Sequence, residues 1–152
     1  MNYEMLLLES NSSGLTVKEK PLKYNDGRIN GKRIAIRRDI LTSAEKACVL
    51  AEELGHYHTT VGNILDQSSV GNRKQELRAR AWAYYKMIGL NGIVRCYKAW
   101  CQNRYVMAEV LDVTEDFLQE ALDYYSGKYG DHASIDNYVI FFQPSLAVLE
   151  LI

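Results

Sequence analysis

The segment Ala51-Glu52-Glu53-Leu54-Gly55-His56 decides how this chain is interpreted. It lies in a run that opens with Thr42-Ser43-Ala44-Glu45, which has the form of a helix capping box. The box and the apolar residues after it predict a helix of about 16 residues, ending near residue 58. On that helix Glu52 lies four residues before His56 and Glu53 lies three before it. The three side chains therefore share one side of a single turn.

This spacing is typical of metal-assisted hydrolysis. In the zinc peptidase motif His-Glu-x-x-His, two histidines four residues apart bind zinc, and the glutamate beside the first acts as general base. The present string differs at the first ligand position, where Glu52 stands. Gly55 also needs a local reason, because glycine inside a helix costs about 1 kcal/mol relative to alanine. Either another backbone or a substrate passes close to His56, or the helix frays near its end.

A second helix is predicted over about residues 73–88, with Gly89 ending it. Glu76 is its only acidic residue, and it shares a face with Ala79 and Ala83. Small residues beside a lone acid permit close packing against the first helix. Because a catalytic zinc has three protein ligands and one open position, Glu76 is the candidate ligand from the neighbouring helix.

Together these residues resemble the ImmA/IrrE family of metallopeptidases, which phages and integrative elements often encode. The family pattern Thr-x-Ala-His-Glu-Leu-Gly-His, followed by a helix Glu-x-x-Ala-x-x-Phe-Ala, is similar to the segment 51–56 and to Glu76-Leu77-Arg78-Ala79-Arg80-Ala81-Trp82-Ala83. The similarity runs in order through about residues 15–125, and its specific motifs are confined to 42–88.

The resemblance implies a role for each matching residue. Glu53 would be the general base, His56 a zinc ligand and Glu76 a second ligand. Glu52 stands where the family has its first histidine, and a carboxylate there would give a Glu/His/Glu set, which favours a harder metal such as Mn²⁺ more than a two-histidine set does. Two alternatives stay open: Glu52 points into solvent, or His58 supplies the missing ligand if the helix ends at His56.

The resemblance further implies a metal-dependent endopeptidase-like protein, with Zn²⁺ as the expected cofactor and Mn²⁺ as the other choice. Its expected partner is a helix-turn-helix repressor made by the same phage or mobile element. An exposed, extended segment of that repressor would lie along the edge of the sheet. The alternative is a catalytically inactive pseudo-peptidase that lacks metal and binds the repressor without cutting it.

The 152 residues fit a single domain. We predict an α+β, zincin-like fold in which a small twisted antiparallel sheet packs on the two active-site helices. Short strands are expected within 15–20, 28–29 and 33–37, after a helix over 2–12. The predicted units are a core over about 15–90, a helical subdomain over about 91–130 with helices near 92–101, 104–111 and 114–126, and a C-terminal hairpin over about 137–152.

Composition excludes several classes of protein. The formal net charge of −1 gives no long-range attraction for nucleic acid or anionic membranes. The predicted helices over 93–125 resemble a helix-turn-helix. Acids on the apparent recognition helix would, however, repel DNA phosphates: Glu115, Asp116, Glu120 and Asp123. Three cysteines without disulfide-framework spacing indicate a reducing compartment. No run approaches the roughly 20 apolar residues of a membrane span. We expect a cytoplasmic protein that does not contact DNA or membranes directly.

Two clusters leave alternatives open. Five cations lie close together in sequence, and they form either a local basic face or an ordinary solvated surface: Arg28, Lys32, Arg33, Arg37 and Arg38. Tyrosines at 84, 85, 124, 125 and 129 form either a peptide-binding surface or the half-buried edge of the core.

Overall fold

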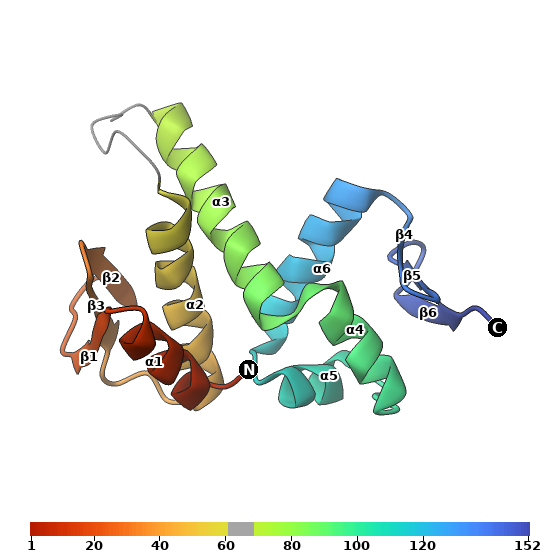
Figure 1. The fold of residues 1–152 in the computed structure, drawn as a ribbon, viewed down its shortest axis with the longest axis horizontal. Coiled ribbons are helices and arrows are strands. Elements are labelled where there is room, and N and C mark those ends of the chain that lie inside the picture. Colours follow the sequence, from red (N-terminus) through yellow and green to blue (C-terminus); the bar gives the residue numbers. More distant parts are fainter. Residues whose placement is uncertain (61–68) are drawn as a thin grey trace.

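The computed structural model describes residues 1–60 and 69–152. Their elements are α1 (Tyr3–Ser12), β1 (Thr16–Lys20), β2 (Gly27–Asn30), β3 (Arg33–Arg37), α2 (Ser43–Thr59), α3 (Ser69–Met87), α4 (Gly89–Lys98), α5 (Arg104–Leu111), α6 (Glu115–Tyr129), β4 (His132–Ile135), β5 (Tyr138–Phe141) and β6 (Ala147–Glu150). Figure 1 shows α2 and α3 side by side, with α1 and one sheet beyond α2 and the remaining helices and second sheet beyond α3. The α+β class is thereby confirmed.

The first sheet has the strand order β1-β3-β2. β2 and β3 form an antiparallel hairpin, whereas β1 runs parallel to β3. The sheet is therefore mixed, and the expectation of purely antiparallel pairing does not hold for β1. The reason is the connection over residues 21–26, which carries the chain past β3 so that β2 forms the far edge. Alternating apolar residues identify strands but do not encode their direction.

Helices α1 and α2 cover one face of this sheet. Thr42 caps α2 by accepting a hydrogen bond from the Glu45 backbone N–H, as the capping box predicts. Ile34 and Ile36 of β3 are buried together with Leu50 and Leu54 of α2. This apolar contact fixes α2 against the sheet and leaves its opposite side for α3.

The second helix begins earlier than predicted, at Ser69. The polar composition of residues 66–72 predicts a loop, but residues 69–72 belong to α3, and residues 66–68 lie outside the described residues. Gly89 has a φ of +63° and separates α3 from α4, which continues the chain after the bend. Within the described residues, no helix is both long and apolar enough to cross a bilayer.

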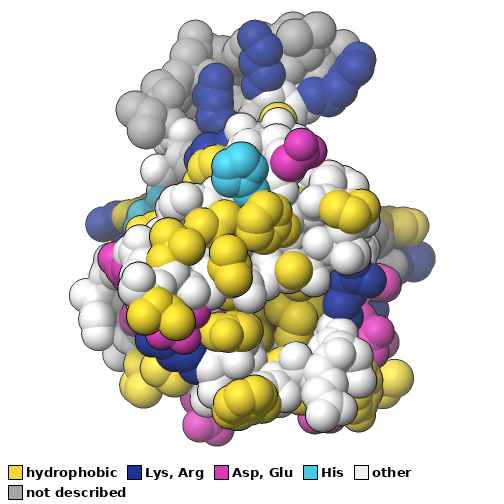
Figure 2. Space-filling model, turned by 90° about the vertical axis from the view of Figure 1, so that its right-hand side faces the viewer, with side chains coloured by type: hydrophobic (Ala, Val, Ile, Leu, Met, Phe, Trp, Pro, Cys, Tyr) yellow, Lys and Arg dark blue, Asp and Glu magenta, His cyan; other side chains and the backbone are white. Residues whose placement is uncertain are grey.

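The C-terminal segment forms a three-stranded antiparallel sheet, β4-β5-β6. β5 and β6 lie in the predicted hairpin region, but β4 was not foreseen. A turn at Asp136, whose φ is +51°, joins β4 to β5. Figure 2 shows the side of the molecule that lies on the right in Figure 1, and hydrophobic side chains gather on this face. Of the tyrosine cluster, Tyr84 and Tyr125 are buried and belong to the core, while Tyr85 is exposed.

Candidate metal and catalytic site

The packing of α2 against α3 brings His56 and Glu76 together. The His56 Nε2 lies 3.4 Å from the Glu76 Oε1. The His56 side chain is 23% exposed and the Glu76 side chain 55%, so the pair lies at an opening to solvent. Two ligand atoms bound to one tetrahedral zinc at about 2.0–2.2 Å are themselves roughly 3.4 Å apart. The two side chains thus already have the separation that a shared metal ion requires.

Gly55 is the reason that these helices approach so closely. A Cβ built on Gly55 would lie 2.2 Å from the Ala79 carbonyl oxygen, far inside contact distance. Ala79 and Ala83 of α3 are fully buried at the same interface. Of the two explanations for this glycine, the close passage of a neighbouring backbone is the one the structure contains.

Glu53 projects from the sheet-facing side of α2, beneath the start of β2. A Cβ built on Gly27 would lie 2.7 Å from Val49 Cγ1 and 3.0 Å from Glu53 Oε1. Gly27 therefore leaves the space in which the Glu53 carboxylate lies. Asn25-Asp26-Gly27 is a turn signal in the sequence. The sequence carries no signal for the contact of Gly27 with Glu53, because that contact is created by the docking of β2 on α2.

Burial raises the pKa of Glu53, and the nearby carboxylates of Glu52 and Glu76 act in the same direction, so that together they bring it to about 7. The carboxylates of Glu52, Glu53 and Glu76, which come from two helices, therefore lie close enough to repel one another. A divalent cation would relieve this repulsion.

Glu52 is half-buried on the same turn of α2. Burial raises its pKa, and the first opposing influence is the positive charge of Arg80. Glu120 of α6 is the next charge that Glu52 meets, and Tyr84 donates a hydrogen bond to Glu120 over 3.3 Å. Glu52 therefore faces a polar cluster of Arg80, Glu120 and Tyr84 at the junction of α2, α3 and α6, in addition to feeling Glu76.

His58 lies elsewhere. α2 continues through Thr59, so His56 and His58 point to different sides of an unbroken helix. The His58 ring stacks on Trp82, with centroids 4.8 Å apart and planes inclined by 20°. The condition under which His58 would replace the missing ligand, a helix ending at His56, is not met.

Only some of the side chains that could bind a metal are in position to do so. His56 and Glu76 have the separation of two ligands, and Glu53 lies close enough to feel Glu76. Within residues 1–60 and 69–152, however, no three side chains of His, Cys, Asp or Glu are already arranged to hold an ion. The sequence departs from the zinc motif at Glu52, which meets the charges of Arg80 and Glu120.

Some residues of this region were missed by sequence reasoning. Arg80 and Tyr84 lie one and two turns beyond Glu76 on α3, and Glu120 lies on α6. None belongs to a local motif. Only the docking of α6 on α3 brings Glu120 to the active-site helices, and that packing leaves no pattern in sequence spacing.

A class of protein follows from this arrangement: two packed helices, of which the first carries Glu53 and His56 and the second Glu76, lie beside a small sheet as in a metallopeptidase-like fold. The model of the IrrE N-terminal-like domain, a peptidase family, matches residues 10–129. The chain belongs to this family. No curated protein and no solved structure matches it.

The raised pKa of Glu53 makes a prediction about stability in metal-free protein. Below pH 4.5 the carboxyl is neutral in both states; between 4.5 and about 7 the folded state keeps a proton that the unfolded state loses. The native protein thus loses stability as pH rises through this window. Glu53→Gln removes the penalty, so its melting temperature in EDTA should exceed that of the wild type at pH 8 and nearly equal it at pH 4.5.

The matched control for that measurement is Glu150→Gln, which removes an exposed carboxylate on β6. It should leave the difference between the two pH values unchanged. A Glu53→Gln variant that is no more stable than the wild type at pH 8 would show that Glu53 is well solvated.

Proposed function

We propose that this protein is a metal-dependent endopeptidase whose substrate is a helix-turn-helix repressor of a phage or mobile element. The observation that carries the proposal is the 3.4 Å approach of His56 to Glu76 from separate helices. Family membership over residues 10–129 supports the peptidase class. Zn²⁺ is the expected metal and Mn²⁺ the alternative, because a set with two carboxylates suits a harder ion.

In this proposal His56 and Glu76 hold the metal, and Glu52 completes the set. A metal held there would supply Lewis acidity, activating a water and polarising the scissile carbonyl. The Glu53 carboxylate would take a proton from the water as its oxygen bonds to the carbonyl carbon, and would give that proton to the leaving amine as the C–N bond breaks.

The edge strand β2 supports an extended substrate. Within the described residues β2 pairs only with β3, so its outer edge has unpaired backbone groups. A substrate strand added there would pass beside Gly27, which lies over Glu53. Extended repressor segments rather than folded helices are therefore the form that this site would accept.

The test is to measure the metal content of the purified protein and then to incubate it with the repressor encoded beside it. Cleavage that appears with added Zn²⁺ or Mn²⁺, and disappears with EDTA, is the expected result, read by mass spectrometry of the fragments. The alternative, a pseudo-peptidase, rests on Glu52 standing in place of the first histidine and on its position beside Arg80. Tight binding without cleavage in either metal would establish that alternative.

A further inference from the structure

The outer face of the first sheet is hollowed and open. α1 and α2 pack on the other face, so the side chains that point away from the helices meet solvent. The hollow has a volume of about 580 Å³. Its lining consists of Thr16, Lys18, Lys20, Leu22, Arg28, Asn30, Arg33, Ile34 and Ala35.

Cations surround this hollow at regular positions. The strand register places Lys18, Ala35 and Arg28 in one row across the sheet, and Thr16, Arg33 and Asn30 in the next. Lys20 lies one pleat further along β1. A small alanine therefore forms part of the floor between longer basic side chains. Every charged residue that lines the hollow is positive.

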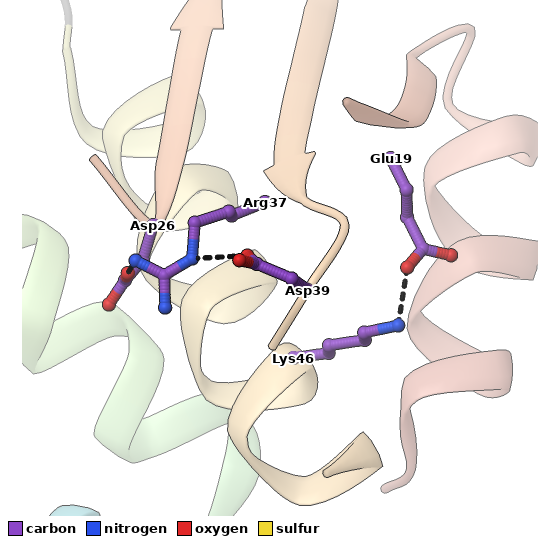
Figure 3. A network of polar contacts seen from close by, with 5 residues as sticks. All are labelled: Glu19, Asp26, Arg37, Asp39 and Lys46. Atoms are coloured by element: carbon purple, nitrogen blue, oxygen red, sulfur yellow. Dashed lines mark hydrogen bonds and ion pairs between the residues drawn. The ribbon is translucent and has the colours of Figure 1, made fainter. Parts of the chain in front are cut away.

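The acids near this sheet are engaged elsewhere. Arg37 lies 2.6 Å from Asp26 and 2.8 Å from Asp39, and Glu19 pairs with Lys46 of α2. Figure 3 shows both groups. In the described part of the chain, none of Lys18, Lys20, Arg28 and Arg33 forms an ion pair with a carboxylate. Of the basic cluster seen in sequence, Arg37 is thus neutralised, whereas Arg28 and Arg33 join two lysines of β1.

We propose that this hollow binds an acidic, extended segment of a protein partner. Side chains two residues apart on a strand lie roughly 6.8 Å apart on one face. Carboxylates at alternate positions of an extended peptide have the same spacing as Lys18 and Lys20, so successive acids meet successive cations. The peptide therefore matches the hollow both in the sign of its charges and in their spacing.

A nucleic acid fits this surface less well. Single strands bind through bases stacked on aromatic rings, and the lining contains none. Duplexes rely on a broad positive field, whereas four cations here belong to a chain of net charge −1. The observations therefore favour a peptide of carboxylates over a phosphate backbone.

This proposal goes beyond the peptidase assignment and does not depend on it. Glu53 lies on the α2 side of the sheet, under Gly27, whereas the hollow opens on the other side. Binding can therefore be measured in EDTA, where metal-dependent hydrolysis makes no contribution.

The experiment uses fluorescence anisotropy with a labelled peptide of about 12 residues in which Glu alternates with Thr, at low salt of about 50 mM. The whole chain is compared with the triple variant Lys18→Gln/Arg28→Gln/Arg33→Gln. We expect the variant to bind roughly tenfold more weakly, since three exposed charge contacts are lost. A peptide with Gln in place of Glu should not bind the wild type.

The matched control is Lys74→Gln/Arg78→Gln/Arg104→Gln, which removes the same charge from exposed positions on α3 and α5. Its affinity should stay within about twofold of the wild type. Equal weakening of both triple variants, or no peptide binding by the wild type, overturns the proposal. So does tighter binding of a thymidine oligonucleotide that the hollow variant loses.

Discussion

Replacing Gly55 with alanine should destabilise the protein by about 3 kcal/mol, the upper part of the range for overpacked interiors. The new Cβ would lie 2.2 Å from the Ala79 carbonyl oxygen, 2.9 Å from its carbon and 3.0 Å from its Cα. All three are backbone atoms, so no rotamer change relieves the overlap. The gain in helix propensity of about 1 kcal/mol is too small to offset it. Urea denaturation followed by circular dichroism measures the effect.

Gly127→Ala is the matched control. Gly127 also lies in a helix, α6, but nothing lies within 4 Å of its added Cβ. Alanine there should stabilise the protein by up to about 1 kcal/mol through propensity alone. If Gly55→Ala instead resembled Gly127→Ala, then α2 and α3 would not be in backbone contact, and the approach of His56 to Glu76 would lose its cause.

The active helix could be predicted from sequence because its signals are local. The capping box at 42–45 sets where α2 begins, and the helical repeat fixes the angle between Glu53 and His56. Glu76 was also found locally, as the lone acid on a face of small residues. The sequence could not decide whether Gly55 marks a close backbone approach or the end of the helix. The answer depends on the backbone of Ala79, which only the packed structure brings beside it.

The parts that could not be predicted are set by tertiary packing. The direction of β1 follows from the path of the chain around β3, which periodicity does not record. The contact between Gly27 and Glu53 joins a strand to a helix, and the Arg80 and Glu120 neighbours of Glu52 come from two further helices. Whether Glu52 can serve as a ligand thus depends on groups that no local motif contains.

Glu53→Gln should reduce peptide hydrolysis by about 10²- to 10⁴-fold, the usual contribution of a general base. The amide keeps the shape of the side chain beneath Gly27 but cannot accept the proton. His56 and Glu76 are untouched, so affinity for Zn²⁺, measured by competition with a chelating dye, should change little. The readout is the rate of repressor cleavage at saturating metal.

The variant Glu52→Gln distinguishes the loss of a metal ligand from the loss of the general base. If Glu52 completes the metal set, its loss weakens zinc affinity, and excess zinc restores part of the activity; Glu53→Gln should show no such rescue. If Glu53→Gln is inactive, a folding defect does not explain the loss. The pKa of the buried Glu53 carboxyl is raised to about 7, so replacing this carboxyl stabilises the metal-free protein above that pH. Greater stability together with lost turnover identifies a group kept for its chemistry. Unchanged turnover in Glu53→Gln would assign the proton transfer to another residue.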